Sequence, residues 1–126
     1  MKLHQKQMKH EEMKTLTNKI WQELQQTRDA GQKEYAHDSN NVFANFERTA
    51  EKLSKSGKSI DREQVLMVFL LKHFDGITSY VDGHKSQRED VRGRIKDAIV
   101  YLMLLWGMIE EKDNDVWKGR NRNSIP

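Results

Sequence analysis

The sequence predicts an all-α protein, a small helical bundle of about four helices with a long antiparallel hairpin at its C-terminal end. Apolar residues recur at helical spacing, no segment alternates as a half-buried strand does, and the single proline is Pro126. A chain of 126 residues fits one domain. We expect this domain to span residues 1–112, with about ten frayed residues at its start and a polar, flexible tail over 113–126.

The first half of the chain predicts one long and one short helix. We expect the long helix over residues 11–27, with Gly31 near its end. Its apolar residues form the stripe of an amphipathic helix: Met13, Leu16, Ile20, Trp21 and Leu24. A polar connector is expected over residues 32–41. The short helix that follows is marked by Val42, Phe43, Phe46, Ala50 and Leu53.

Two capping motifs mark the starts of the hairpin helices. Asp61 with Gln64 resembles a capping box, and Ser86 with Glu89 is a clean one. From these caps we expect helices to about Val81 and to about Lys112, joined by a short turn. The segment 65–71 is apolar all round, and the longest apolar run of the chain begins at Ala98. Both helices should therefore be buried on most sides.

The composition restricts the class of protein. The net charge is +3 and both signs are mixed along the chain, whereas a DNA-binding domain shows a denser basic face. The basic residues at the two ends leave nucleic-acid binding as a weakly supported option. There is no cysteine for a disulfide or a thiolate metal site. The longest apolar run is too short for a bilayer, and the first twenty residues lack an apolar signal segment. We therefore expect a cytoplasmic protein with no membrane partner.

Charged side chains interrupt the apolar stretches of both hairpin helices. Lys72 and Asp75 share one face of the third helix, and Asp90, Arg94 and Asp97 share one face of the fourth. Asp97 directly precedes the most apolar run, where a carboxylate needs Lys72, Arg94 or a metal ion as its partner. Three interpretations stay open. The charges form ion pairs on a solvated face, or they form a polar interface with a partner. Alternatively, they line a cleft between the helices in which Lys72 and Arg94 bind phosphate and Asp75, Asp90 and Asp97 bind Mg²⁺.

Glycines and connector residues add to these candidates. Gly76 and Gly93 lie beside the charged residues, where they indicate either close helix packing or room for a ligand. The ring of Tyr35 could stack on a base, and the amide of Asn45 could recognise its edge. The alternative for this region is a capping loop. The histidines lack the paired spacing of a zinc site.

Several short motifs occur in an order that resembles a known family. They are Lys33-Glu34-Tyr35, Asn41-Val42-Phe43-Ala44-Asn45-Phe46, Leu71-Lys72-His73-Phe74-Asp75-Gly76-Ile77, Glu89-Asp90 and Asp97-Ala98-Ile99-Val100-Tyr101-Leu102. Over roughly residues 28–111 the chain resembles bacteriophage proteins of the nucleotide modification associated domain type. This resemblance implies nucleotide or DNA metabolism in a phage-infected host cytoplasm, without defining a reaction.

A more distant resemblance is to the all-α nucleotide pyrophosphohydrolases of the MazG type. Those enzymes hold Mg²⁺ with a pair of carboxylates on each of two adjacent helices. Here each helix offers one cation and one acid instead, Lys72 with Asp75 and Arg94 with Asp97. This mixture favours a nucleotide-binding protein over a hydrolase.

Three functions follow as hypotheses from the sequence. The first is a nucleotide-binding protein of nucleotide metabolism or modification, in which Lys72, Arg94, Tyr35 and Asn45 bind the nucleotide and Mg²⁺ is a possible cofactor. The second is an interaction protein without enzymatic activity that sequesters a host signalling nucleotide or blocks a host factor. The third is a nucleoside triphosphate pyrophosphohydrolase. Apolar surface on the first helix, at Trp21 and Leu24, suggests a homodimer.

Overall fold

The structure is a computed structural model that describes residues 7–35, 40–55, 57–84 and 88–120, with side chains up to Asp113. In these ranges it contains four helices and no strand: α1 (His10–Tyr35), α2 (Ala44–Ser54), α3 (Arg62–Val81) and α4 (Val91–Arg120). The predicted all-α fold is confirmed. No helix within the described ranges is long and apolar enough to cross a membrane.

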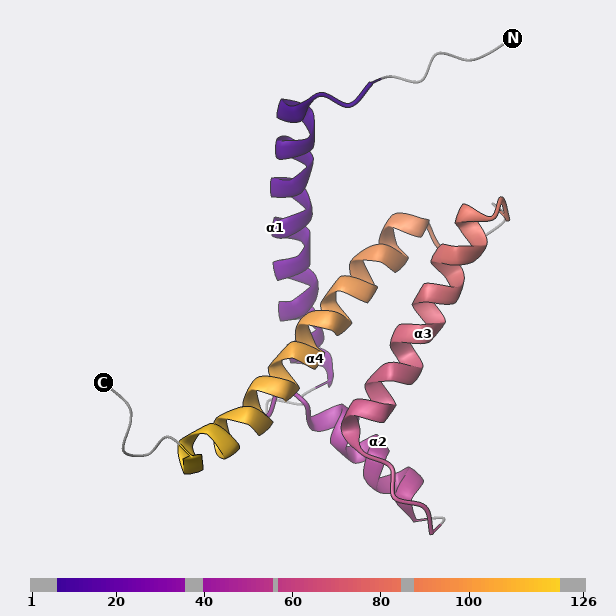
Figure 1. The fold of residues 1–126 in the computed structure, drawn as a ribbon. Helices are drawn as coiled ribbons and strands as arrows, with labels where there is room; N and C mark the ends of the chain where they lie inside the picture. The colour runs from indigo at the N-terminus through magenta and orange to yellow at the C-terminus, as the bar shows by residue number, and fades with distance from the viewer. Residues whose placement is uncertain (1–6, 36–39, 56, 85–87, 121–126) are drawn as a thin grey trace.

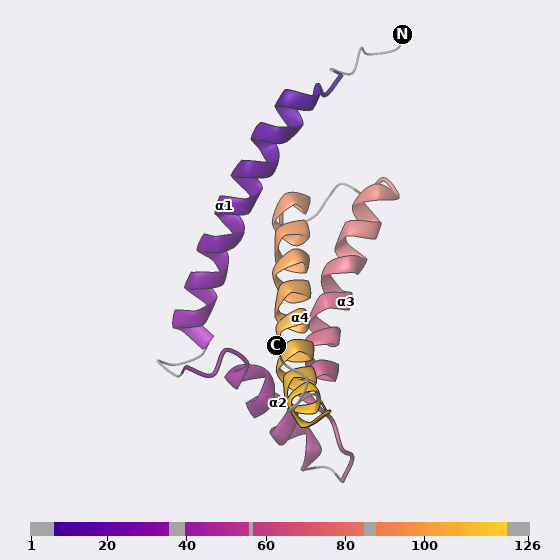
Figure 2. The same ribbon diagram turned by 60° about the vertical axis from the view of Figure 1, so that its left-hand side comes forward.

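Helices α3 and α4 form the predicted antiparallel hairpin (Figure 1). Helix α2 packs across the base of this hairpin, against α3. The second half of α1 packs along α4, whereas its first half extends beyond the hairpin (Figures 1 and 2). The hairpin is thus the centre of the molecule, and the other two helices attach to it.

Helix α1 is longer than the sequence pattern indicates. It continues through Gly31 to Tyr35, so the first residues of the predicted connector are helical. One glycine costs a helix only about 1 kcal/mol relative to alanine, and Gln32, Lys33 and Glu34 are good helix formers. Residues 36–39 of the predicted connector lie outside the described residues.

The capping box at the start of α3 is confirmed. The Gln64 backbone N–H donates to Asp61 Oδ1 over 2.8 Å, and the Asp61 N–H donates to Gln64 Oε1 over 2.9 Å. Helix α4 begins later than predicted, at Val91, because Asp90 supplies the acceptor for the Arg92 N–H at 2.8 Å. This hydrogen bond lowers the pKa of the exposed Asp90 carboxyl. The predicted cap Ser86 lies outside the described residues.

Helix α4 also continues past Lys112 to Arg120, so the first part of the predicted flexible tail is helical. Neither proline nor glycine occurs between Asp113 and Lys118, so nothing in the local sequence ends the helix there.

The core lies between α2 and the hairpin. Its buried residues are Phe43, Phe46 and Ala50 in and just before α2, Val65, Leu66 and Leu70 of α3, and Ala98 and Met108 of α4. The prediction that α3 and α4 are buried on most sides is wrong for the single chain. Val68 remains 68% exposed and Trp106 remains 69% exposed. The other helices of the chain cover only one side of the hairpin.

Arg62 joins three helices at the base of the hairpin. Its Nη1 lies 3.1 Å from Glu47 Oε2 of α2 and 3.1 Å from Glu111 Oε1 of α4, and its Nε lies 3.1 Å from Glu63 Oε1. The guanidinium carbon also lies 4.9 Å from the centre of the Phe43 ring. Burial lowers the pKa of Arg62, but its hydrogen bonds to Glu63 and Glu111 outweigh this effect and raise it.

Replacing Arg62 by Met should lower the free energy of unfolding by about 2 kcal/mol, because charged hydrogen bonds and a cation–π contact are lost together. Urea denaturation measures this change. Arg92→Met is the matched control, since Arg92 is exposed and pairs only with the neighbouring Asp90 among the described residues. Equal effects of the two substitutions would contradict the role of Arg62.

Candidate functional site

A cavity of about 510 Å³ lies where the second half of α1 meets α2 and α4. Residues from all four helices line it: Thr27, Arg28, Ala30, Gly31, Gln32, Glu34 and Tyr35 of α1, Val42, Asn45 and Phe46 in and before α2, Phe69 of α3, and Asp97, Val100, Tyr101 and Leu104 of α4. Ligand sites in proteins commonly have a volume between 300 and 1,000 Å³, roughly. We call this cavity the α1–α4 pocket.

Three aromatic rings pack together in the wall of the α1–α4 pocket. Phe69 and Tyr101 are stacked, with ring centres 6.1 Å apart and an interplanar angle of 9°. Phe46 meets both rings edge-on, at 6.4 Å from Phe69 and 6.2 Å from Tyr101. Edge-on and stacked contacts are the favoured geometries of aromatic pairs. The wall is therefore a rigid apolar surface contributed by α2, α3 and α4.

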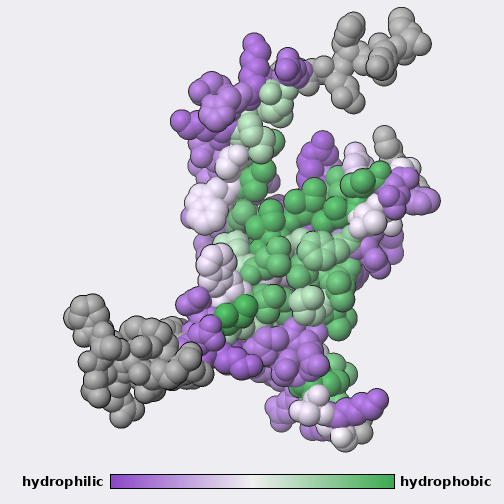
Figure 3. All heavy atoms as spheres, viewed as in Figure 1, coloured by the Kyte–Doolittle hydropathy of each residue, from purple (hydrophilic) through white to green (hydrophobic). Residues whose placement is uncertain are grey.

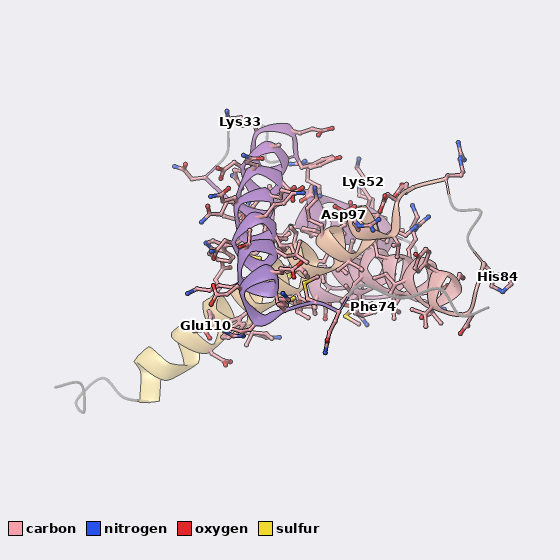
Figure 4. All side chains as sticks on the ribbon, turned by 90° about the horizontal axis from the view of Figure 1, so that it is seen from above. Lys33, Lys52, Phe74, His84, Asp97 and Glu110 are labelled. Carbon is pink, nitrogen blue, oxygen red and sulfur yellow. The ribbon has the colours of Figure 1, made fainter. Side chains whose placement is uncertain are left out.

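Asp97 places a carboxylate beside this aromatic wall. It lies one helical turn before Tyr101 and is partly buried. No lysine or arginine among the described residues forms an ion pair with it. This includes the two partners that the sequence predicted, Lys72 and Arg94. Figure 4 shows Asp97 close to α1, whereas His84 lies at the distant tip of the hairpin.

The pKa of Tyr101 depends on the burial of its phenol and on the charge of Asp97. Burial raises the pKa of its phenol, and the negative charge of Asp97 raises it further, with a smaller effect of Tyr35. A phenol with a raised pKa stays neutral to higher pH and can donate a hydrogen bond to a ligand.

Two further polar groups belong to α1 and α2. The Arg28 guanidinium contacts Gln32 Oε1 at 3.4 Å and, among the described residues, pairs with no carboxylate. The side-chain amide of Asn45 makes no hydrogen bond within the described part of the chain, although its backbone oxygen accepts from Thr49. The backbone oxygen of Tyr35 accepts from Arg48 Nη2 at 2.9 Å, which ties the end of α1 to α2.

The α1–α4 pocket brings together three residues that the sequence singled out separately. Tyr35, Asn45 and Asp97 come from three different helices and all line it. The other four candidates do not line it. Lys72 and Asp75 of α3 are exposed. Their exposure fits the solvated-face interpretation.

The predicted metal ligands are separated in the same way. Asp90 caps the start of α4, Asp75 lies on the outer face of α3 and Asp97 lines the pocket. Within the described ranges, no three histidine, aspartate or glutamate side chains are close enough to hold a metal ion together.

Arg94 is used for packing between the hairpin helices. A methyl group added at Gly76 would lie 2.5 Å from Arg94 Cδ and 2.6 Å from Nη1, so Gly76 makes room for this side chain. The Nε atom of Arg94 is buried and has no hydrogen-bond partner among the described residues. Gly76 thus marks a close approach of two helices, whereas a methyl group at Gly93 would meet nothing within 4 Å.

Sequence reasoning missed Arg28 and the aromatic wall. The signal for Arg28 depended on the true end of α1. In a helix that continues to Tyr35, the residues Leu24, Arg28, Gly31 and Tyr35 follow at steps of four, three and four, and they share one face. The contribution of Phe69 and Tyr101 had no local signal, because it depends on how the hairpin packs.

Comparison with models of known protein families, with characterised proteins and with solved structures finds no match for this chain. The description of the site therefore rests on its own geometry.

Replacing Gly76 by Ala should have two opposing effects on the free energy of unfolding. The added methyl group disturbs the packing of Arg94, and this loss offsets the gain in helix propensity. In an Arg94→Ala background the same change should raise the free energy of unfolding by about 1 kcal/mol, the helix-propensity difference alone. Denaturation of the four proteins of this double-mutant cycle measures the coupling, and Gly93→Ala is the control. Additive effects would show that Arg94 does not occupy the space over Gly76.

Replacing Asp97 by Asn should lower the pKa of Tyr101, because a negative charge near the phenol is removed. Absorbance titration of tyrosinate measures this change in a background where Tyr35 and Tyr80 are replaced by Phe. Asp75→Asn, outside the pocket, should leave the titration unchanged. An unchanged titration in Asp97→Asn would contradict the placement of this carboxylate beside Tyr101.

Proposed function

We propose that the protein binds a nucleotide, with the base held in the α1–α4 pocket. The observation that carries this proposal is a partly buried carboxylate, Asp97, that has no cationic partner among the described residues and lies beside a wall of aromatic rings. A carboxylate in such surroundings is costly unless hydrogen-bond donors answer it. A ligand that is flat, aromatic and rich in N–H groups satisfies the wall and the carboxylate together.

The groups around the pocket match the parts of a base. A base can pack its face on the aromatic wall, or on the ring of Tyr35 at the rim. Asp97 accepts hydrogen bonds, and the Asn45 amide both donates and accepts. Together they can recognise a base edge that carries neighbouring N–H donors and a carbonyl group. This pattern favours guanine, whose N1–H and N2–H₂ groups face one carboxylate.

Arg28 is the cation that can receive the phosphate. It lines the pocket from α1, and its guanidinium has no carboxylate partner among the described residues. A planar guanidinium fits phosphate oxygens in a two-point contact. In this proposal Arg28 takes the role that the sequence assigned to Lys72 and Arg94. Any Mg²⁺ would enter with the phosphates of the nucleotide, since Asp97 is the one predicted metal ligand in the pocket.

Calorimetry with mono-, di- and triphosphates of the four bases, with and without Mg²⁺, tests this function. We expect the intact protein to bind, and Arg28→Met to weaken the binding of phosphorylated ligands by about ten- to a hundredfold. Asp97→Asn should weaken binding of guanine nucleotides more than that of the others.

Lys72→Met and Asp75→Asn are the matched controls, because both residues are exposed outside the pocket. Unchanged binding in both is expected. The proposal fails if the intact protein binds no nucleotide, or if Lys72→Met weakens binding as much as Arg28→Met does. Analysis of the nucleotide after incubation separates binding alone from pyrophosphate release.

A further inference from the structure

The side of the hairpin opposite the α1–α4 pocket is apolar and uncovered. On α3 it consists of Met67, Leu71, Phe74 and Val81, and on α4 it consists of Ile95, Leu102, Trp106 and Ile109; all eight are exposed. We call this surface the hairpin face. Figure 3 shows hydrophobic atoms spread continuously over α3 and α4 in this view.

Helical geometry places both stripes on one side of the hairpin. The α3 residues follow at steps of four, three and seven, and the α4 residues at steps of seven, four and three, so each set forms a single stripe. On each helix the stripe lies about a quarter to a third of a turn around the helix axis from the core residues, and in the same direction when each helix is viewed from its N-terminus. Because the two helices are antiparallel, these equal rotations are mirror images of each other when the hairpin is viewed from one end. Both stripes thus lie on the same side of the hairpin. They therefore form one surface rather than two.

The hairpin face has the apolar composition of a protein core. Leu71 is 55% exposed and Trp106 is 69% exposed, yet both belong to segments that are apolar nearly all round. A helix with apolar residues on every side is normally buried on every side. In the described part of the chain, α2 and α1 pack on the opposite side and nothing packs here.

The size of the hairpin face fits an interface between two copies. Its eight large apolar residues are each between 37% and 75% exposed. Monomeric proteins rarely expose a contiguous apolar patch of more than a few hundred Å², roughly, whereas a standard protein interface buries about 800 Å² on each partner.

We propose that the hairpin face packs against the hairpin face of a second copy of this chain. None of the eight residues that define the face is charged, although Trp106 Nε1 donates a hydrogen bond to Glu110 Oε1 over 3.2 Å. An apolar surface of this kind is complementary to itself. A two-fold axis through the face closes the assembly and buries both stripes of each copy. The two hairpins then form a four-helix layer, which is the usual way to cover both sides of such helices.

Sedimentation equilibrium of the intact chain over a range of micromolar concentrations tests this interface. We expect a mass of twice 14.9 kDa. Leu71→Glu and Trp106→Glu should each shift the dissociation constant by at least about a hundredfold, since a charge would be buried on both copies. Lys72→Glu, one residue along α3 and outside the stripe, is the matched control and should leave the dimer intact. Circular dichroism checks that each variant is helical.

Cross-linking keeps the proposal testable if a glutamate variant fails to fold. The chain has no cysteine, so Leu71→Cys and Lys72→Cys each introduce a single thiol. A short bifunctional maleimide should join two copies of Leu71→Cys and not of Lys72→Cys. A monomer at every concentration would overturn the proposal, as would equal dissociation or equal cross-linking of the paired variants. Binding of lipid vesicles by a monomeric chain would assign the face to a membrane instead.

Discussion

The α3–α4 hairpin is apolar on two opposite sides, and the described helices α1 and α2 cover only one of them. This constraint accounts for most features of the structure. Helix α2 and the second half of α1 take one side, where Phe46 closes the core against Phe69 and Tyr101. On the other side, large apolar residues that are normally buried in a protein core remain exposed. These exposed residues are the basis of the proposed pairing with a second copy of the chain.

The covered side also explains where the polar groups can act. Helix α1 meets the hairpin at an angle (Figure 2). The second half of α1 and the facing residues of α4 line the α1–α4 pocket. Among the described side chains of α4, Asp97 is the acidic residue that lines this pocket, because it lies one turn before Tyr101 on the side that faces α1. Lys72 and Asp75 of α3 are exposed and do not line this pocket. Position on the hairpin, rather than charge alone, decides which polar residue can meet a ligand.

The sequence predicted the fold class well because helical spacing and caps are local properties. Asp61 and Gln64 defined the start of α3 from four residues of sequence, and the structure confirms both hydrogen bonds. Boundaries without a strong local signal were less reliable. Gly31 does not end α1, and α4 starts at Val91 because the carboxylate of the preceding Asp90 caps the helix.

The site was predicted only in part, and the reason is geometric. Tyr35, Asn45 and Asp97 were identified by their chemistry, but nothing local showed that α1 would bring Tyr35 to Asp97. Lys72 shares a face with Asp75, and spacing alone could not tell whether that face meets a neighbour or solvent. This distinction depends on which side of α3 the other helices cover, which is a property of the packed molecule.

The most direct test of the central constraint is the accessibility of Trp106 to a neutral quencher such as acrylamide. Replacing Trp21 and Trp117 by Phe leaves Trp106 as the only tryptophan of the chain. In the single chain this indole is 69% exposed, on the uncovered side of the hairpin. Our account predicts that quenching is weak at concentrations where the chain is assembled and rises on dilution. Strong quenching at every concentration would show that this side of the hairpin stays open to water, and would contradict the account.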